Sequence, residues 1–150
     1  MRTYRAGYLT GMLVCLFSTP VLAVNESCHV ARAQFTTNIV NREPVDKVVV
    51  LDTESTQNLF YFTELQHCQG KTLTHRWEFS GKIITETPFV VKGPRWRVYS
   101  KKYLEPDNRG KWSVVVVDEA GWPLNATIFY YGVTPDVSGS KNPSHLILPN

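Results

Sequence analysis

Short stretches of alternating apolar and polar residues recur along the chain, and no segment shows a sustained 3.6-residue period. Successive side chains of a strand point to opposite faces, so this alternation predicts β-strands that are buried on one face. The clearest stretch is KWSVVVVD, residues 111–118. Further strands are expected within residues 29–40, 47–51, 59–65, 72–79, 83–91, 95–101 and 124–133.

Turn-forming segments rich in Gly, Pro, Asn and Asp separate these stretches. Examples are NREPVD after residue 40, CQGK after residue 67 and EPDNRG after residue 104. About seven or eight short strands, with turns every 8 to 12 residues or so, predict an all-β antiparallel sandwich or barrel. Pro88 lies inside one stretch and indicates an edge strand or a bulge.

The same alternation assigns side chains to faces. In RWRVYSKK, residues 95–102, the parity directs Trp96 and Val98 toward the core, with Ser100 on the same face. The opposite parity places four residues on the surface: Arg95, Arg97, Tyr99 and Lys101. Two other inward-facing sets are expected, namely Ala31, Ala33, Phe35, Thr37 and Ile39, and Leu73, His75, Trp77 and Phe79.

The first 23 residues have the features of a secretory signal peptide. Arg2 and Arg5 precede a short apolar run, and Val21 and Ala23 occupy the small-residue positions of a cleavage site. The alternative, an uncleaved membrane anchor, is disfavoured because the run is shorter than the roughly 20 apolar residues of a membrane span. We therefore expect a signal peptide over 1–23, a β-sandwich domain over 24–134 and a flexible tail over 135–150. The mature protein would be periplasmic, without stable membrane insertion.

Removal of this leader changes the charge and the cysteine count. The full chain has 16 Lys and Arg against 13 Asp and Glu, and loss of Arg2 and Arg5 leaves 14 against 13, a net charge of +1. Nucleic-acid-binding domains are strongly basic, so nucleic acid is not an expected partner. Cys28 and Cys68 remain, and an even count in an exported chain predicts a disulfide. Free thiols, or a metal site with the adjacent His29 and His67, are the alternatives.

Six motifs follow one another along the chain in a characteristic order: ARAQFTTNIVNREPVD, FYFTEL, GKTLTHRWEF, RWRVYSKK, GKWSVVVVDEAGWPL and FYYGV. Over about residues 30–133 this order resembles the bacterial domain-of-unknown-function family 2914. The resemblance implies a small exported or membrane-tethered domain with an immunoglobulin-like β-sandwich fold. It implies no activity and therefore transfers no catalytic residues.

The sequence contains no motif of a catalytic nucleophile, a zinc protease, a phosphate-binding loop or a dinucleotide site. Carboxylates that an acid–base pair would need are present at Glu54, Glu64, Glu78 and Asp118, but any sandwich surface offers such groups. We expect a protein that is not an enzyme and that uses no metal or cofactor. An unrecognised hydrolase is the least favoured alternative.

Two aromatic side chains, His75 and Trp122, have two interpretations each. His75 is either a hydrogen-bonded core histidine or a ligand contact or pH-sensitive group. Trp77, Trp96 and Trp112 have the parity of core residues. Trp122 lies in the turn AGWP, where its ring either stacks on a sugar or anchors a partner, or covers the end of the core.

The outward basic and aromatic residues are the main candidate ligand-binding set: Arg76, Arg95, Arg97, Tyr99 and Lys101, together with Trp122. If Arg76 and Arg97 share a sheet, they form a stripe suited to a polymer that carries carboxylates or phosphates. The alternative is cross-strand pairing with Glu78, Glu86 and Glu105. The expected function is therefore a binding or protein-interaction domain of the bacterial cell envelope, with carbohydrate binding as the alternative.

Overall fold

Ten strands and one short 3-10 helix follow one another along residues 26–51 and 57–133, the part of the chain that the computed structural model describes. The elements are β1 (His29–Thr36), β2 (Ile39–Val40), β3 (Glu43–Pro44), β4 (Val50–Leu51), β5 (Gln57–Gln66), β6 (Thr72–Phe79), β7 (Lys82–Val90), β8 (Arg95–Leu104), η1 (Pro106–Asn108), β9 (Gly110–Val117) and β10 (Pro123–Tyr131). The predicted signal peptide and the tail 135–150 lie outside the described residues. Within these residues, no helix has the length and apolar character needed to cross a bilayer.

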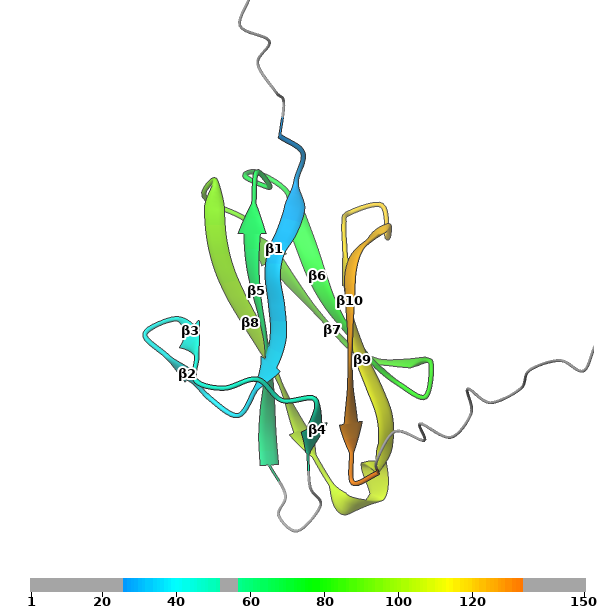
Figure 1. Cartoon of the computed structure of the whole chain (residues 1–150). Coiled ribbons are helices and arrows are strands. Elements are labelled where there is room, and N and C mark those ends of the chain that lie inside the picture. The colour runs from blue at the N-terminus through cyan, green and yellow to red at the C-terminus, as the bar shows by residue number, and fades with distance from the viewer. Residues whose placement is uncertain (1–25, 52–56, 134–150) are drawn as a thin grey trace, which may run out of the picture.

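Two sheets pack face to face and form a β-sandwich (Figure 1). One sheet has the order β1-β5-β8, and the other has the order β4-β10-β9-β6-β7. The predicted all-β antiparallel sandwich is confirmed, with one departure: the two-residue strand β4 pairs in parallel with β10. The immunoglobulin-like subclass stays a prediction.

The core lies between the sheets and is rich in aromatic rings. Trp77 of β6 packs against Phe35 of β1, with ring centroids 5.7 Å apart, and Phe35 lies 4.5 Å from Phe129 of β10. Trp112 of β9 stacks on Phe129 at 6.2 Å. The inward parity predicted for β6 is confirmed, as are the core positions of Val98, Trp77 and Trp112.

The predicted faces are partly wrong in β1. Ala31 is exposed, although the alternation places it inward with Phe35. The pairing of β1 with β5 shifts register between Val30 and Arg32, so the parity before the irregularity differs from the parity after it. Val30 and Ala33 consequently pack against the core. The strand also ends at residue 36, and Thr37 is exposed.

A disulfide joins Cys28, just before β1, to Cys68 in the turn after β5, which confirms the predicted pair. The two Cα atoms are 4.4 Å apart across a sequence separation of 40 residues. His29 and His67 stack on each other at 5.8 Å instead of joining the sulfur atoms in a ligand set, and His67 contacts the carboxylate of Glu26. Among the described residues, no group of three His, Cys, Asp or Glu side chains converges on a metal position.

Candidate functional site

The candidate ligand-binding residues fall into three separate places. Arg76 lies on β6, and Trp122 lies in the turn between β9 and β10, so both belong to the five-stranded sheet. The other four candidates, Arg95, Arg97, Tyr99 and Lys101, lie on β8 in the three-stranded sheet. Because Arg76 and Arg97 are in different sheets, the stripe that would join them does not form.

Arg76 pairs with a carboxylate of its own strand. Its Nε donates to Glu78 Oε1 at 2.8 Å, and Glu78 also accepts a hydrogen bond from Ser113 of β9. Glu86 stands opposite Arg76 in the pairing of β6 with β7. The sequence offered pairing with Glu78 as the alternative to a ligand contact, but as a pair across strands, whereas Arg76 and Glu78 are two residues apart on β6.

The outer face of β8 carries an alternating row of basic and aromatic side chains. Arg95 and Arg97 lie at its start, and Tyr99 and Tyr103 are 48% and 54% exposed. Lys101 lies exposed between the two tyrosines. Alternate residues of a strand are roughly 7 Å apart, so these side chains form one continuous surface row. The predicted surface parity of β8 is confirmed.

Glu64 of β5 lies at the centre of a charge cluster on this face. Arg95 binds its two carboxylate oxygens through Nε at 2.8 Å and Nη2 at 2.9 Å, a bidentate arrangement. Arg97 Nε donates to Glu64 Oε2 at 3.2 Å, and Arg32 Nη1 of β1 lies 3.6 Å from the same oxygen. The Glu64 side chain is only 3% exposed. Glu43 of β3 completes the cluster by contacting Arg32 and Arg97.

The arginines determine the protonation state of Glu64. Hydrogen bonds from Arg95, and then from Arg97, lower the pKa of Glu64 from 4.5 to about 2, against the opposing effect of burial. The carboxylate is therefore charged at neutral pH. Sequence reasoning considered Glu64 only as an acid–base candidate and missed this role. The sequence does contain one signal of it: the alternation in LFYFTEL places Glu64 on the same face of the strand as Phe60 and Phe62.

The hairpin β2–β3 adds to this outer face. Arg42 in its turn lies over the ring of Trp96, 5.7 Å from guanidinium carbon to ring centroid. Arg32 lies over the ring of Phe62 at 5.0 Å, and Phe62 is fully buried although its parity points away from the main core. The Arg32 side chain thus covers Phe62 on the outer side of the three-stranded sheet, whereas Trp96, which packs against the core, is contacted by Arg42.

His75 is a buried residue of the core. Its Nε2 lies 2.9 Å from Thr63 Oγ1, and its Nδ1 lies 2.9 Å from Ser100 Oγ, which also accepts a hydrogen bond from Trp77 Nε1. Burial lowers the pKa of His75 to about 3, so the ring is neutral at physiological pH. The interpretation as a hydrogen-bonded core histidine is confirmed.

The contact between Ser100 and His75 resembles a nucleophile with its base, but its surroundings differ from those of a reactive pair. His75 is fully buried, and Ser100 is 5% exposed. A base also needs a pKa near the working pH, and the neutral ring of His75 has its pKa far below it. Thr63 and Ser100 from one sheet and His75 and Trp77 from the other instead form a polar connection across the core.

Trp122 projects from a turn that hydrogen bonds hold in shape. Asp118 Oδ1 accepts from the backbone nitrogens of Ala120 at 2.9 Å and Trp122 at 2.8 Å, and the Asp118 nitrogen donates to the Trp122 carbonyl at 3.0 Å. Gly121 supplies the left-handed conformation of the turn, with φ 84°. Glu119 Oε1 accepts from the Thr72 nitrogen at 2.7 Å and thereby ties the turn to β6.

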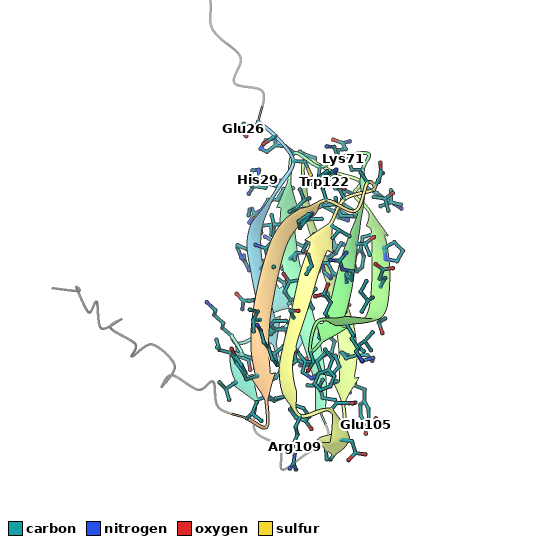
Figure 2. All side chains as sticks on the ribbon, turned by 90° about the vertical axis from the view of Figure 1, so that its right-hand side faces the viewer. Glu26, His29, Lys71, Glu105, Arg109 and Trp122 are labelled. Atoms are coloured by element: carbon teal, nitrogen blue, oxygen red, sulfur yellow. A yellow bond between two sulfur atoms is a disulfide. The ribbon has the colours of Figure 1, made fainter. Side chains whose placement is uncertain are left out.

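The Trp122 side chain is 71% exposed, so it does not cover the end of the core. Figure 2 shows it at the end of the molecule that also holds His29 and Lys71, whereas Glu105 and Arg109 lie at the opposite end. A shallow hollow lined by Lys71, Asp118, Glu119 and Ala120 lies in the same turn region. The exposure disfavours the interpretation of Trp122 as a cover of the core, and its role as a ligand or partner contact stays a prediction.

Comparison with known proteins gives one family. Residues 70–131 match the profile of a family described as "Protein of unknown function (DUF2914)". This segment contains β6 to β10, and therefore Arg76, the basic and aromatic row of β8 and Trp122. A search among curated proteins finds no match.

Proposed function

We propose that this protein, in which residues 70–131 match the profile of the DUF2914 family, is a non-catalytic binding domain of the bacterial cell envelope. The protein is exported to the periplasm and binds a protein partner there. The observation that carries the proposal is Trp122, a large aromatic side chain that is 71% exposed on a turn whose backbone is held by Asp118.

An exposed tryptophan on a hydrogen-bonded turn suits a binding surface for two physical reasons. The ring contributes a large apolar area to a contact, and tryptophan is among the residues that dominate the energy of protein interfaces. Hydrogen bonds to Asp118 and Glu119 already order the turn in the free protein. Binding of a partner therefore costs little additional conformational entropy of the backbone. Exposure of such a ring costs hydrophobic free energy in the free protein, and contact with a partner recovers it.

The internal polar groups support binding over catalysis. His75 and Ser100 are enclosed between the sheets, and Glu64 is held by arginines on an outer face. Glu78 pairs with Arg76, and Asp118 stabilises its own turn. These groups thus have structural roles: His75 and Ser100 together in the core, and Glu64, Glu78 and Asp118 at three separate places. Glu54 lies outside the described residues.

Carbohydrate binding is the second candidate, and the surroundings of Trp122 favour it specifically. Sugar recognition combines an aromatic face with polar groups at its edge. Lys71, Asp118 and Glu119 lie in the same turn region and supply such groups. In the cell envelope, peptidoglycan is the obvious glycan to test.

Substitution of Trp122 by alanine is expected to abolish capture of the partner. Immobilised wild-type protein and Trp122→Ala would be incubated in parallel with envelope extract and with purified peptidoglycan sacculi. Tyr103→Ala is the matched control, because Tyr103 is also an exposed aromatic residue, 54% exposed, but lies on β8. Retention of a protein by wild type and Tyr103→Ala, with loss in Trp122→Ala, supports the proposal.

Other results separate the two candidates. If wild type and Tyr103→Ala bind sacculi, Trp122→Ala does not, and no protein is retained, the ligand is a glycan and not a protein. Equal retention by all three proteins, or by none, would contradict a binding role for Trp122. Circular dichroism of each variant checks that the fold is intact.

Export is tested by the mass of the protein recovered from the periplasm. We expect an N-terminus near Val24, which reports removal of the leader. The mass should be two hydrogens below that of the dithiol form, because Cys28 and Cys68 are joined. Recovery of the full-length chain from membranes would contradict cleavage, and two free thiols would contradict the disulfide in the exported protein.

A further inference from the structure

Glu43 holds two arginines of the three-stranded sheet in the way that an anionic ligand would. Its Oε2 contacts Arg32 Nη2 at 2.7 Å, and its Oε1 contacts Arg97 Nη1 at 3.0 Å. One carboxylate thus bridges guanidinium groups from the two outer strands of the sheet, β1 and β8. Guanidinium groups favour carboxylate and phosphate oxygens, and two of them on one face present donors to both oxygens of one anion.

The other carboxylate of the cluster is fixed in place. Glu64 is 3% exposed and occupies the inner side of the cluster, with Arg95 bound to both of its oxygens. Glu43, in contrast, is 40% exposed, as is Arg32, and Arg97 is 31% exposed. Three guanidinium groups against two carboxylates leave a charge of +1 in the cluster, so the solvent-facing side of the arginines favours an anion.

Glu43 stands on a small hairpin whose base is anchored better than its tip. Strands β2 and β3 have two residues each. At the base, Asp46 accepts hydrogen bonds from Thr36 Oγ1 at 2.6 Å and from the Thr37 nitrogen at 2.8 Å. At the tip, Asn41 and Arg42 have φ of 50° and 64°, the conformation of a two-residue hairpin turn, and the tip is held by the contact of Arg42 with Trp96 and by the ion pairs of Glu43. Contacts between partly exposed charged side chains contribute little stability, so the tip opens locally at low free-energy cost.

We propose that Arg32 and Arg97 form a binding site for a carboxylate- or phosphate-bearing ligand, and that Glu43 occupies this site until the ligand displaces it. The ligand oxygens replace those of Glu43 at Arg32 Nη2 and Arg97 Nη1. Tyr99 and Lys101 continue the row along β8, so a longer anionic molecule finds further contacts there. The site belongs to a different sheet from the Trp122 turn, and it stands whether or not Trp122 binds a partner.

Displacement makes a quantitative prediction. A tethered carboxylate competes at a high effective concentration. The apparent affinity of a free anion is its intrinsic affinity multiplied by the fraction of molecules whose site is open. Glu43→Gln removes the competing charge and keeps the size of the side chain. We expect this variant to bind inorganic phosphate at least about tenfold more tightly than the wild type, where tenfold corresponds to about 1.4 kcal/mol.

The measurement is a titration with inorganic phosphate, and separately with acetate, followed by the NMR signals of the arginine Nε–H groups. Shifts are expected at Arg32 and Arg97, with little change at Arg76. A stronger response to phosphate identifies a phosphate-bearing ligand class, and an equal or stronger response to acetate identifies a carboxylate-bearing class. In Glu43→Gln/Arg32→Gln, the gain in affinity should be lost.

Glu78→Gln is the matched control, because it makes the same change in net charge and frees the single guanidinium of Arg76 on the other sheet. It should leave phosphate binding close to that of the wild type. The proposal is overturned if Glu43→Gln shows no gain, if Glu78→Gln shows the same gain, or if the shifts appear away from Arg32 and Arg97. Folding of Glu43→Gln is checked in the same spectra by the dispersion of the backbone signals.

Discussion

Replacement of Trp112 by alanine is expected to lower the free energy of unfolding by about 3 to 5 kcal/mol. The ring is 1% exposed and packs between Phe79, at 4.9 Å, and Phe129, at 6.2 Å. Its Nε1 also donates to the carbonyl of Asn108 at 2.8 Å, and truncation leaves that acceptor without this partner. Chemical denaturation followed by far-ultraviolet circular dichroism measures the loss.

The matched control for this substitution is Trp122→Ala. It removes the same side chain from a position that is 71% exposed, so we expect a change within about 0.5 kcal/mol. A loss below about 1 kcal/mol for Trp112→Ala would contradict its place in the packed core. Large losses in both variants would show that the Trp122 turn supports the fold rather than presenting a free ring.

The second large effect is expected for Glu64→Gln, which should lose about 3 kcal/mol at neutral pH. Arg95 and Arg97 hold the pKa of Glu64 at about 2, against 4.5 for an ordinary glutamate, and the side chain is 3% exposed. Because the folded pKa is depressed, the charged form stabilises the fold. Glu78→Gln removes a carboxylate paired with one half-buried arginine, and we expect a smaller loss of about 1 kcal/mol or less.

The contribution of Glu64 is present above pH 4.5 and is lost as the pH falls from 4.5 toward 2, because the unfolded chain takes up the proton first. His75 also destabilises the fold in acid. Burial lowers the pKa of His75 from 6.5 to about 3. The unfolded chain therefore binds a proton that the buried ring does not, and the fold loses stability as the pH falls from 6.5 toward 3. Glu64→Gln retains the His75 effect, and the difference between the two proteins isolates Glu64.

Denaturation of wild type and Glu64→Gln at a series of pH values provides the measurement. The stability difference should be constant above about pH 5 and should shrink toward zero near pH 2. A difference that does not change between pH 5 and pH 2 would mean that the loss arises from packing, not from the charge of Glu64.

Sequence pattern alone predicted the sandwich, because two-residue periodicity and turn residues are local signals. Trp77 and Trp112 entered the core, and Arg97 and Tyr99 reached the surface, as parity requires. The error at Ala31 arose from an irregularity in strand pairing, which depends on β5 as the partner and leaves no clear mark in the sequence of β1.

The candidate site was less predictable, because it depends on which strands are neighbours. Parity placed Arg76 and Arg97 on outward faces, but only the order of the strands shows that the two residues lie in different sheets. Likewise, Glu64 and Glu43 meet the arginines of β8 through pairing across the sheet and through a hairpin that folds back. The conformation of the Trp122 turn depends on hydrogen bonds from its backbone to Asp118, four residues earlier, a contact that the turn sequence suggests but does not require.

Site-specific photocrosslinking in cells tests the proposed binding role most directly. A photoreactive phenylalanine derivative would replace Ala120, an exposed residue of the same turn that leaves Trp122 in place, in one exported protein and the exposed Tyr103 in another. A binding surface at the β9–β10 turn predicts a discrete crosslinked product from position 120 and none from position 103. No product from either position, or the same products from both, would contradict it.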